Sequence, residues 1–228
     1  MRAAQIVTCD RPPVVTEWPE PAAPGPGERL VRFPTSAGMA AGDGSMAELA
    51  RVPAEDLVEL PAGADPVAVA ALGLSAVAAY QALTWRGELA AGEQVLVLGA
   101  GLAARLAAAC DGPVDLVLDP LYGVPAAAAA RTLRPGGRLV NLGGSAGETS
   151  PLDSSTLRSR SLRVLGYTNN ELTRERRAAA VRRVAELAVA GRLGVACEPV
   201  PLADAPAAWH RQATGTASGR LVLLPAPA

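Results

Sequence analysis

The sequence predicts an α/β fold built on a reduced parallel sheet of about four strands, together with a small, truncated β domain. Residues 95–98 and 114–118 are short, uninterrupted apolar runs, which are typical of parallel strands covered on both faces. Between them lie a glycine turn, an alanine-rich stretch and a break at Gly112 and Pro113, so the segment forms one strand–helix–strand unit. The chain has 228 residues and is 50% apolar, which is enough to bury a sizeable core.

Residues 1–60 are predicted to be β structure. Turns rich in proline and glycine separate short β-prone runs, which should form a small barrel or folded sheet; the runs span residues 3–7, 14–18, 29–33 and 47–52. Asp65 and Pro66 then supply the N-cap and first turn of a helix that should extend to about Trp85. Because this helix is apolar on nearly all sides, we expect it to be buried between two layers.

The rest of the chain alternates between helical and strand-like segments. Helices are expected over residues 124–133, 173–190 and 203–214, with a short helix or loop over 151–160. Strands are expected over residues 138–142, 162–166 and 220–224.

Composition excludes several classes of function and partner. The net charge of −1 favours neither nucleic acid nor a membrane surface, and no stretch is expected to span a bilayer. All basic residues are Arg, which removes a Schiff-base lysine from consideration. The odd, widely spaced Cys9, Cys110 and Cys197 predict reduced, buried thiols in a cytoplasmic protein, and a single His leaves too few ligands for zinc.

The glycine turn has two interpretations. Gly99, Ala100 and Gly101 begin a G-x-G-x-x-A spacing, and a helix starting there would offer free N–H groups to a pyrophosphate. The same fingerprint requires an acid about 20 residues later to hold a ribose hydroxyl. Asp119 lies near that distance, but it closes the second strand of the same unit. A tight turn that needs two glycines explains the spacing equally well.

Segments in family order along the whole chain carry a resemblance to known proteins. They include Pro24-Gly-Pro-Gly27, the helix over 65–83, residues 91–100, residues 133–143 and residues 218–223. Through them the chain resembles the medium-chain dehydrogenase/reductase superfamily, in its zinc-independent quinone oxidoreductase and enoyl reductase branch. The resemblance implies a GroES-like domain from residues 1–73 plus 194–228 and a Rossmann-like domain over 74–193. It also implies NADPH as cofactor, no zinc, and a homodimer paired through residues 162–166.

Two blocks of the family pattern are missing. One falls between Gly38 and Asp43, and the other falls just after Ala100. In a sheet ordered 3-2-1-4-5-6, the second loss removes strands 2 and 3 and leaves strands 1, 4, 5 and 6 contiguous. The shortened chain can therefore still fold, but it loses the half that holds the adenosine end of the cofactor, which makes NADPH binding doubtful.

The site is expected where the remaining strands end, since ligands of such sheets bind outside the carboxyl ends of the strands. The cofactor-binding candidates are Gly99, Ala100, Gly101, Leu142, Gly143, Thr168 and Asn169. The catalytic candidates are Asp119, Tyr122 and Tyr167, of which Asp119 could serve as a base. Turn formation by Asp119 and helix capping by Thr168 and Asn169 are the alternatives.

Three classes of function remain open. The first is an NADPH-dependent reductase of a quinone, enone or enoyl-type small molecule. The second is a nicotinamide-independent isomerase, cyclase or lyase that acts on an unsaturated carbonyl metabolite in secondary metabolism. The third is a non-catalytic dimeric homologue. Binding of NADPH separates the first class from the other two.

Overall fold

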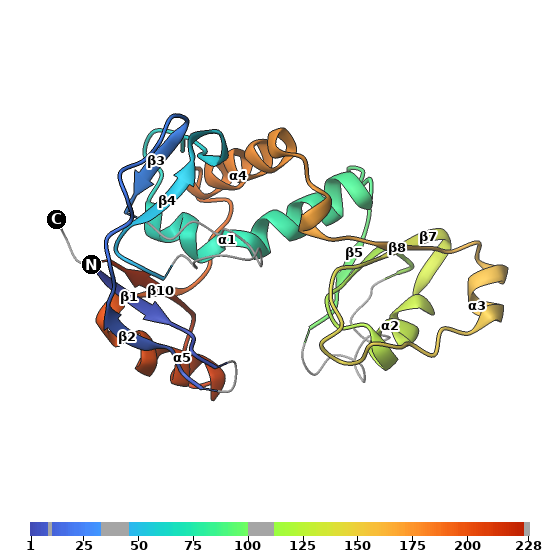
Figure 1. Cartoon of the computed structure of the whole chain (residues 1–228). Helices are drawn as coiled ribbons and strands as arrows, with labels where there is room; N and C mark the ends of the chain where they lie inside the picture. The colour runs from blue at the N-terminus through green and yellow to red at the C-terminus, as the bar shows by residue number, and fades with distance from the viewer. Residues whose placement is uncertain (9–10, 33–45, 100–111, 226–228) are drawn as a thin grey trace. The chain divides into compact units, whose positions relative to one another are not determined.

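The computed structural model describes residues 1–8, 11–32, 46–99 and 112–225, which belong to two compact units (Figure 1). Unit 1 comprises Met1–Leu74 and Arg174–Ala228, and unit 2 comprises Ser75–Thr173. The sequence predicts the second boundary at residues 193/194 instead. Helix α4, Arg174–Val189, lies in unit 1, where Arg174 pairs with Glu55 and Asp56 at N···O distances of 2.9 and 2.8 Å.

Unit 2 contains a four-stranded parallel sheet in the order β5-β6-β7-β8. The strands are β5 (Val95–Val97), β6 (Val114–Asp119), β7 (Leu133–Asn141) and β8 (Arg163–Gly166). Leu118 of β6 lies opposite Val140 of β7, which lies opposite Leu165 of β8. The predicted α/β fold with about four parallel strands is confirmed.

The core of unit 2 forms because apolar strand residues meet an alanine face. Helix α2, Gly123–Ala130, consists almost entirely of small residues, which lets it pack closely on the sheet. Its Ala126 and Ala129 are fully buried beside Val117 and Leu139. The short helix α3, Ser154–Ser159, is capped by Asp153, whose Oδ1 accepts a hydrogen bond from the Thr156 amide at 2.7 Å. Helix α2 thus lies in the connection from β6 to β7, and α3 lies in the connection from β7 to β8.

The spatial order of the strands equals their order along the chain. Each crossover therefore moves one strand further in the same direction. Right-handed crossovers of this kind place their connecting segments on one face of the sheet. The π-helical turn η2, Ala82–Arg86, also contacts β7.

Unit 1 is built from three two-stranded sheets. Its strands are β1 (Arg2–Gln5) with β2 (Val14–Glu17), β3 (Glu28–Val31) with β4 (Ala50–Pro53), and β9 (Cys197–Pro201) with β10 (Arg220–Leu224). Besides α4 and the first part of α1, the unit contains helix α5 (Ala205–Ala213) and the 3-10 turns η1 (Ala54–Asp56) and η4 (Leu202–Asp204). The expected small barrel or folded sheet over residues 1–60 is seen in part, because an isolated bridge between Ala3 and Ala47 links β1 to the segment before β4.

Strand β9 was not expected from the sequence, because Pro199 and Pro201 argue against a strand. The structure pairs it in parallel with β10, with Pro199 opposite Val222. Proline is tolerated at the edge of a sheet, where its missing N–H need not face the partner strand. The expectation that Cys197 is a buried thiol is also wrong, since Cys197 lies exposed on β9.

Helix α1, Pro66–Gln81, begins as predicted and then breaks. The Oδ1 atom of Asp65 accepts a hydrogen bond from the Val67 amide at 2.9 Å, which confirms the N-cap. At Gly73 the backbone leaves the helical region, with φ 43° and ψ −144°. Burial of the helix, which we expect to lie between two layers, is incomplete at Leu74, which is 50% exposed. Alanine-rich composition made the helix apolar without making every face a packing surface.

The segment Pro66–Arg86 is long and apolar enough, by length and composition, to cross a membrane, with a mean hydropathy of 1.7. The expectation that no stretch reaches this threshold is therefore wrong. The backbone break at Gly73 interrupts this segment. Core helices of globular proteins pass the same test, so the finding is weak evidence for a membrane span.

Candidate functional site

The carboxyl ends of the four strands meet at one edge of the unit 2 sheet. We call this edge the carboxyl edge; its described residues are Leu98–Gly99, Pro120–Tyr122, Leu142–Ser145 and Tyr167–Asn169. Backbone hydrogen bonds tie neighbouring ends together. The Leu142 amide donates to the Asp119 carbonyl at 2.9 Å, and the Tyr167 amide donates to the Asn141 carbonyl at 2.9 Å. Candidates that are far apart in the sequence thus lie on one edge.

Asp119 ends β6 and is fully buried. Its Oδ1 atom accepts hydrogen bonds from the Leu121 and Tyr122 amides at 3.0 and 2.8 Å. Its Oδ2 atom accepts one from the Asn141 side-chain amide at 3.2 Å. The carboxylate therefore shapes the turn after β6, as the turn interpretation predicts. These three hydrogen bonds leave the carboxylate one acceptor position on Oδ2, and its role as a catalytic base stays a prediction.

Asn141 is a residue that the sequence reasoning missed. Besides Asp119 Oδ2, its Nδ2 atom donates to the Asp119 carbonyl at 3.2 Å and to the Gly143 carbonyl at 2.7 Å. One amide group thus connects the end of β6 with the loop that follows β7. The available signal was a single polar residue that closes an apolar strand, but strand periodicity alone gives no partner for it.

Tyr122 is held in an unusual backbone conformation, with φ 55° and ψ −152°, just before α2. It forms an isolated β-bridge with Gly147, and its side chain packs against the core of unit 2. The Ala146 amide donates to the Leu121 carbonyl at 2.8 Å. The turns after β6 and β7 are therefore fastened to each other. A catalytic role for Tyr122 is not tested by these contacts.

The glycines of the carboxyl edge differ in what surrounds them. A Cβ atom built on Gly143 would lie 2.8 Å from the Pro120 carbonyl oxygen, so packing inside the protein requires glycine there. A Cβ atom on Gly99 or Gly166 would meet no atom of the described chain within 4 Å. No contact of the described protein therefore requires glycine at these two positions. Glycine lets a ligand approach the backbone closely.

Tyr167 is the first residue after β8, and its side chain is buried. Its hydroxyl donates to Asn169 Oδ1 at 2.6 Å, and its ring meets Trp85 edge-on with centroids 6.3 Å apart. Burial, followed by the charge of Glu171, raises the pKa of the Tyr167 phenol above its ordinary value. The hydroxyl therefore stays protonated at neutral pH, and it would have to release Asn169 Oδ1 before it could donate its proton to a ligand.

The remaining cofactor-binding candidates differ in their hydrogen-bond partners, and two of them are not described. Thr168 caps the short 3-10 turn η3, Asn169–Glu171, since its hydroxyl accepts from the Asn170 amide at 3.3 Å. Asn169 is engaged by Tyr167. Ala100 and Gly101 lie outside the described residues. These contacts do not test cofactor binding by Thr168 or Asn169, so the ligand-binding role of both residues stays a prediction.

The opposite end of the sheet carries a charged network that the sequence reasoning also missed. Arg138 on β7 is 3% exposed and binds Glu93 through both guanidinium Nη atoms. Arg134 pairs with Asp115 and lies 3.4 Å from Glu93. Hydrogen bonds from Arg138 and from the Ala90 amide lower the pKa of Glu93 to about 2. Each of these charges is used within the protein.

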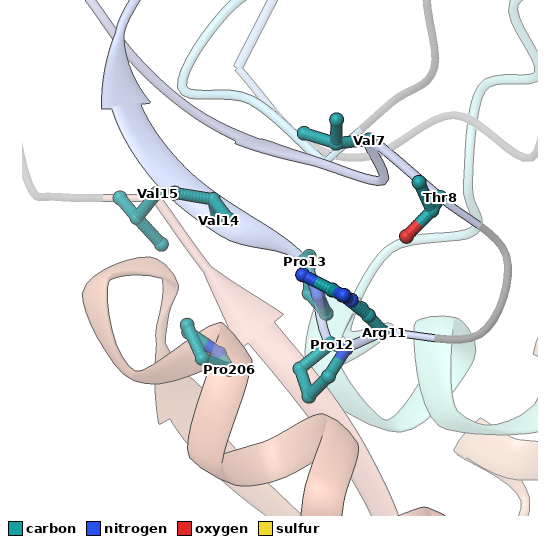
Figure 2. Close-up of a pocket in the computed structure, with 8 residues that line it drawn as sticks. All are labelled: Val7, Thr8, Arg11, Pro12, Pro13, Val14, Val15 and Pro206. Carbon is teal, nitrogen blue, oxygen red and sulfur yellow. The ribbon is translucent and has the colours of Figure 1, made fainter.

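The described residues also form a cavity of about 630 Å³ in unit 1 (Figure 2). Its walls are mostly apolar, and only Thr8 and Arg11 bring polar side chains; the lining residues are Val7, Thr8, Arg11, Pro12, Pro13, Val14, Val15 and Pro206. None of the predicted site residues lines this cavity. It therefore provides no support for a site at the carboxyl edge.

Comparison with known proteins identifies the family. The profile described as zinc-binding dehydrogenase matches residues 91–223. The chain belongs to this family. It is a shortened member of the medium-chain dehydrogenase/reductase superfamily, as the resemblance predicts, and the family is of the oxidoreductase type. No match was found among curated protein sequences.

Solved structures give the same fold at low sequence identity. A mycobacterial quinone oxidoreductase has a TM-score of 0.82 and 17% identity over 99% of this chain and 100% of its own. The protein AibC has a TM-score of 0.80 and 17% identity over 100% of both chains. A mycobacterial protein complexed with NADPH has a TM-score of 0.76 and 18% identity over 99% of this chain and 100% of its own. At these identities the likeness establishes the fold alone.

The family name raises the question of zinc. Within residues 1–8, 11–32, 46–99 and 112–225, no group of three or more His, Cys, Asp or Glu side chains is placed to hold a metal ion. The whole chain has one His, and Cys197 lies on β9 of unit 1. The described residues therefore do not fit a zinc site, whereas the open glycines of the carboxyl edge fit the close approach of a nucleotide.

Proposed function

We propose that the chain is a reductase that uses NADPH to reduce a quinone, enone or enoyl-type small molecule. The observation that carries the proposal is that no described atom lies within 4 Å of a Cβ built on Gly99 or Gly166, at the edge where ligands of parallel sheets bind. Membership of a dehydrogenase family supports it, as does the likeness to a quinone oxidoreductase and to a protein complexed with NADPH.

Bound NADPH would supply a hydride for the β-carbon of an unsaturated carbonyl compound, and a proton from solvent would complete the reduction. The chain's own contribution would be binding and alignment. We assign the backbone of Gly99, Leu142 and Gly143 and the side chains of Thr168 and Asn169 to cofactor binding. The protonated Tyr167 hydroxyl is the candidate donor to the substrate carbonyl oxygen.

Calorimetric titration with NADPH tests this proposal directly. We expect micromolar binding by the wild-type chain. The added methyl group of Gly99→Ala should keep NADPH from approaching the backbone and weaken its binding about tenfold, which corresponds to about 1.4 kcal/mol. Gly112→Ala is the matched control. Gly112 lies before β6, at the other end of the sheet, and an added Cβ would make ordinary contact with Gln94 at 3.6 Å. Absence of binding at millimolar NADPH would refute the proposal.

If NADPH binds, reduction of a quinone, an enone and an enoyl thioester should be compared next. Loss of NADPH absorbance that depends on one of these substrates identifies its class. Tyr167→Phe should lower the catalytic rate more than it raises the KM for NADPH, because the phenol would act on the substrate. An equal rate for Tyr167→Phe and the wild type would remove Tyr167 from the mechanism.

One observation favours a second candidate function. The order of the strands that the structure describes in unit 2 shows no reversal, whereas dinucleotides bind at such a reversal. A nicotinamide-independent isomerase, cyclase or lyase on an unsaturated carbonyl metabolite would need no dinucleotide. Conversion of such a compound without any added nucleotide, together with no binding of NADPH, would favour this candidate.

We also propose that the chain forms a homodimer through β8. This strand is at the end of the sheet order, and Val164 on it is 41% exposed. Edge strands of this kind readily pair with another chain. Light scattering on the purified chain should give twice the mass of 23.1 kDa, and a monomeric mass would refute the pairing.

A further inference from the structure

The strand order of unit 2 bears on which part of a nucleotide the chain recognises. Dinucleotide-binding sheets combine two mononucleotide-binding halves, and the strand order reverses where the halves meet. In this chain the order β5-β6-β7-β8 runs in one direction without reversal. The described strands therefore amount to one complete half, β6-β7-β8, and a single strand, β5, of the other.

The length of the chain leaves no place for the second half between β5 and β6. Residues 98–113 are all that connects the two strands, and they must make the crossover between parallel neighbours. One such crossover already takes about a dozen residues. Two additional strands with their own crossovers would require several times that number.

The outer edge of β5, which pairs with no other described strand, is consistent with this limit on length. β5 ends the sheet order, and Val97 on it is 54% exposed in the part of the chain that the structure describes. In a complete dinucleotide-binding sheet the neighbouring strand would lie here. The end of that strand carries the acid that holds the adenosine ribose, or lies near the Arg that accommodates its 2′-phosphate.

Resting on the proposed function, we propose that the carboxyl edge recognises only the nicotinamide mononucleotide half of the cofactor. The loops after β7 and β8, which hold Gly143 and Tyr167–Asn169, remain to contact that half. The adenosine half makes no contact that contributes to affinity. NADPH, NADH and reduced nicotinamide mononucleotide are therefore equivalent ligands of this chain.

Calorimetric titrations of the full chain with these three compounds test the inference without any measurement of activity. We expect three dissociation constants that agree within about threefold, because only the shared half is bound. Adenosine 2′,5′-bisphosphate, which represents the other half of NADPH, should neither bind nor compete at millimolar concentration.

Binding of NADPH at least tenfold tighter than reduced nicotinamide mononucleotide would overturn the inference and leave the proposed function intact. Competition by adenosine 2′,5′-bisphosphate would do the same. Failure of all three reduced nucleotides to bind would overturn both. Preference for NADPH over NADH by tenfold would show that the 2′-phosphate is recognised, which also contradicts the inference.

A variant pair locates the binding. Asn141→Ala loosens the loop after β7 and should weaken all three reduced nucleotides by the same factor. Arg163→Gln is the control, since Arg163 begins β8 at the opposite end of the sheet and makes an exposed pair with Glu88. Unequal effects of Asn141→Ala on NADPH and reduced nicotinamide mononucleotide would contradict recognition through the shared half alone.

Discussion

The two ends of the unit 2 sheet differ in how their polar residues are paired. At the amino end, Glu93, Asp115, Arg134 and Arg138 form ion pairs with one another. At the carboxyl edge, Asp119 is fully buried and is held by amide donors, with no ion pair among the described residues. The amino end thus uses its charges for its own stability, whereas the carboxyl edge leaves glycine positions open.

This difference teaches how to separate structural from ligand-binding polar groups. A buried guanidinium that is paired on several sides has no capacity left for a ligand. Where no neighbour in the protein requires glycine, packing does not explain the residue, and close approach of a ligand is an alternative reason. Substitutions at the two ends should therefore affect different properties, and the following predictions are ordered from the largest expected effect.

Glu93→Gln should cause the largest loss of stability. It leaves the Arg138 guanidinium, which is 3% exposed, without its carboxylate partner. Removal of one partner of a buried pair costs about 3 kcal/mol. Chemical denaturation of the chain measures this loss. Glu88→Gln is the control, because its pair with Arg163 is exposed; an equal loss in both variants would contradict the assignment of the network as structural.

Gly143→Ala should destabilise the chain, whereas Gly99→Ala should not. The new Cβ at residue 143 would lie 2.8 Å from the Pro120 carbonyl oxygen, and relief of such overpacking costs about 2 kcal/mol. A Cβ at residue 99 meets no atom of the described residues within 4 Å. Thermal unfolding of the two variants makes the comparison. A folded, equally stable Gly143→Ala variant would show that the two turns are not fixed against each other.

Asn141→Ala should cost about 1 kcal/mol and act locally. It removes the donor shared by Asp119 and the Gly143 carbonyl, so the loop after β7 opens more often. Hydrogen exchange should become faster at the Leu142 and Ala146 amides, which donate to the turn after β6. Unchanged exchange at these amides would mean that Asn141 does not hold the loop.

Acid should weaken the charged network at the amino end of the sheet. The pKa of Glu93 is lowered from its ordinary value of 4.5 to about 2, so its ionised form is favoured in the folded state. The stability from this shift is fully present above about pH 4.5 and is lost as the pH falls towards 2. Denaturation at several pH values should show a smaller decrease over this window for Glu93→Gln than for the wild type. Parallel curves would contradict the shift.

The sequence was sufficient for the parallel strands, because apolar runs such as Val114–Leu118 can only be buried, but it placed the start of β7 at residue 138 where the strand begins at Leu133. It failed where the decisive partner is distant in the chain. Nothing near Asn141 shows that it meets Asp119, and nothing near Arg138 shows that it meets Glu93. Local rules also misjudged β9, where prolines are tolerated at an edge, and α1, where Gly73 breaks an apolar run.

The most direct test of the account is hydrogen exchange across unit 2 with and without saturating NADPH. We predict slower exchange at the carboxyl edge, in particular at the amides of residues 142–146 and 167–169. We predict no change at the amino end, around Glu93 and residues 134–138. Protection at the amino end, or no protection at either end, would contradict a nucleotide site at the carboxyl edge.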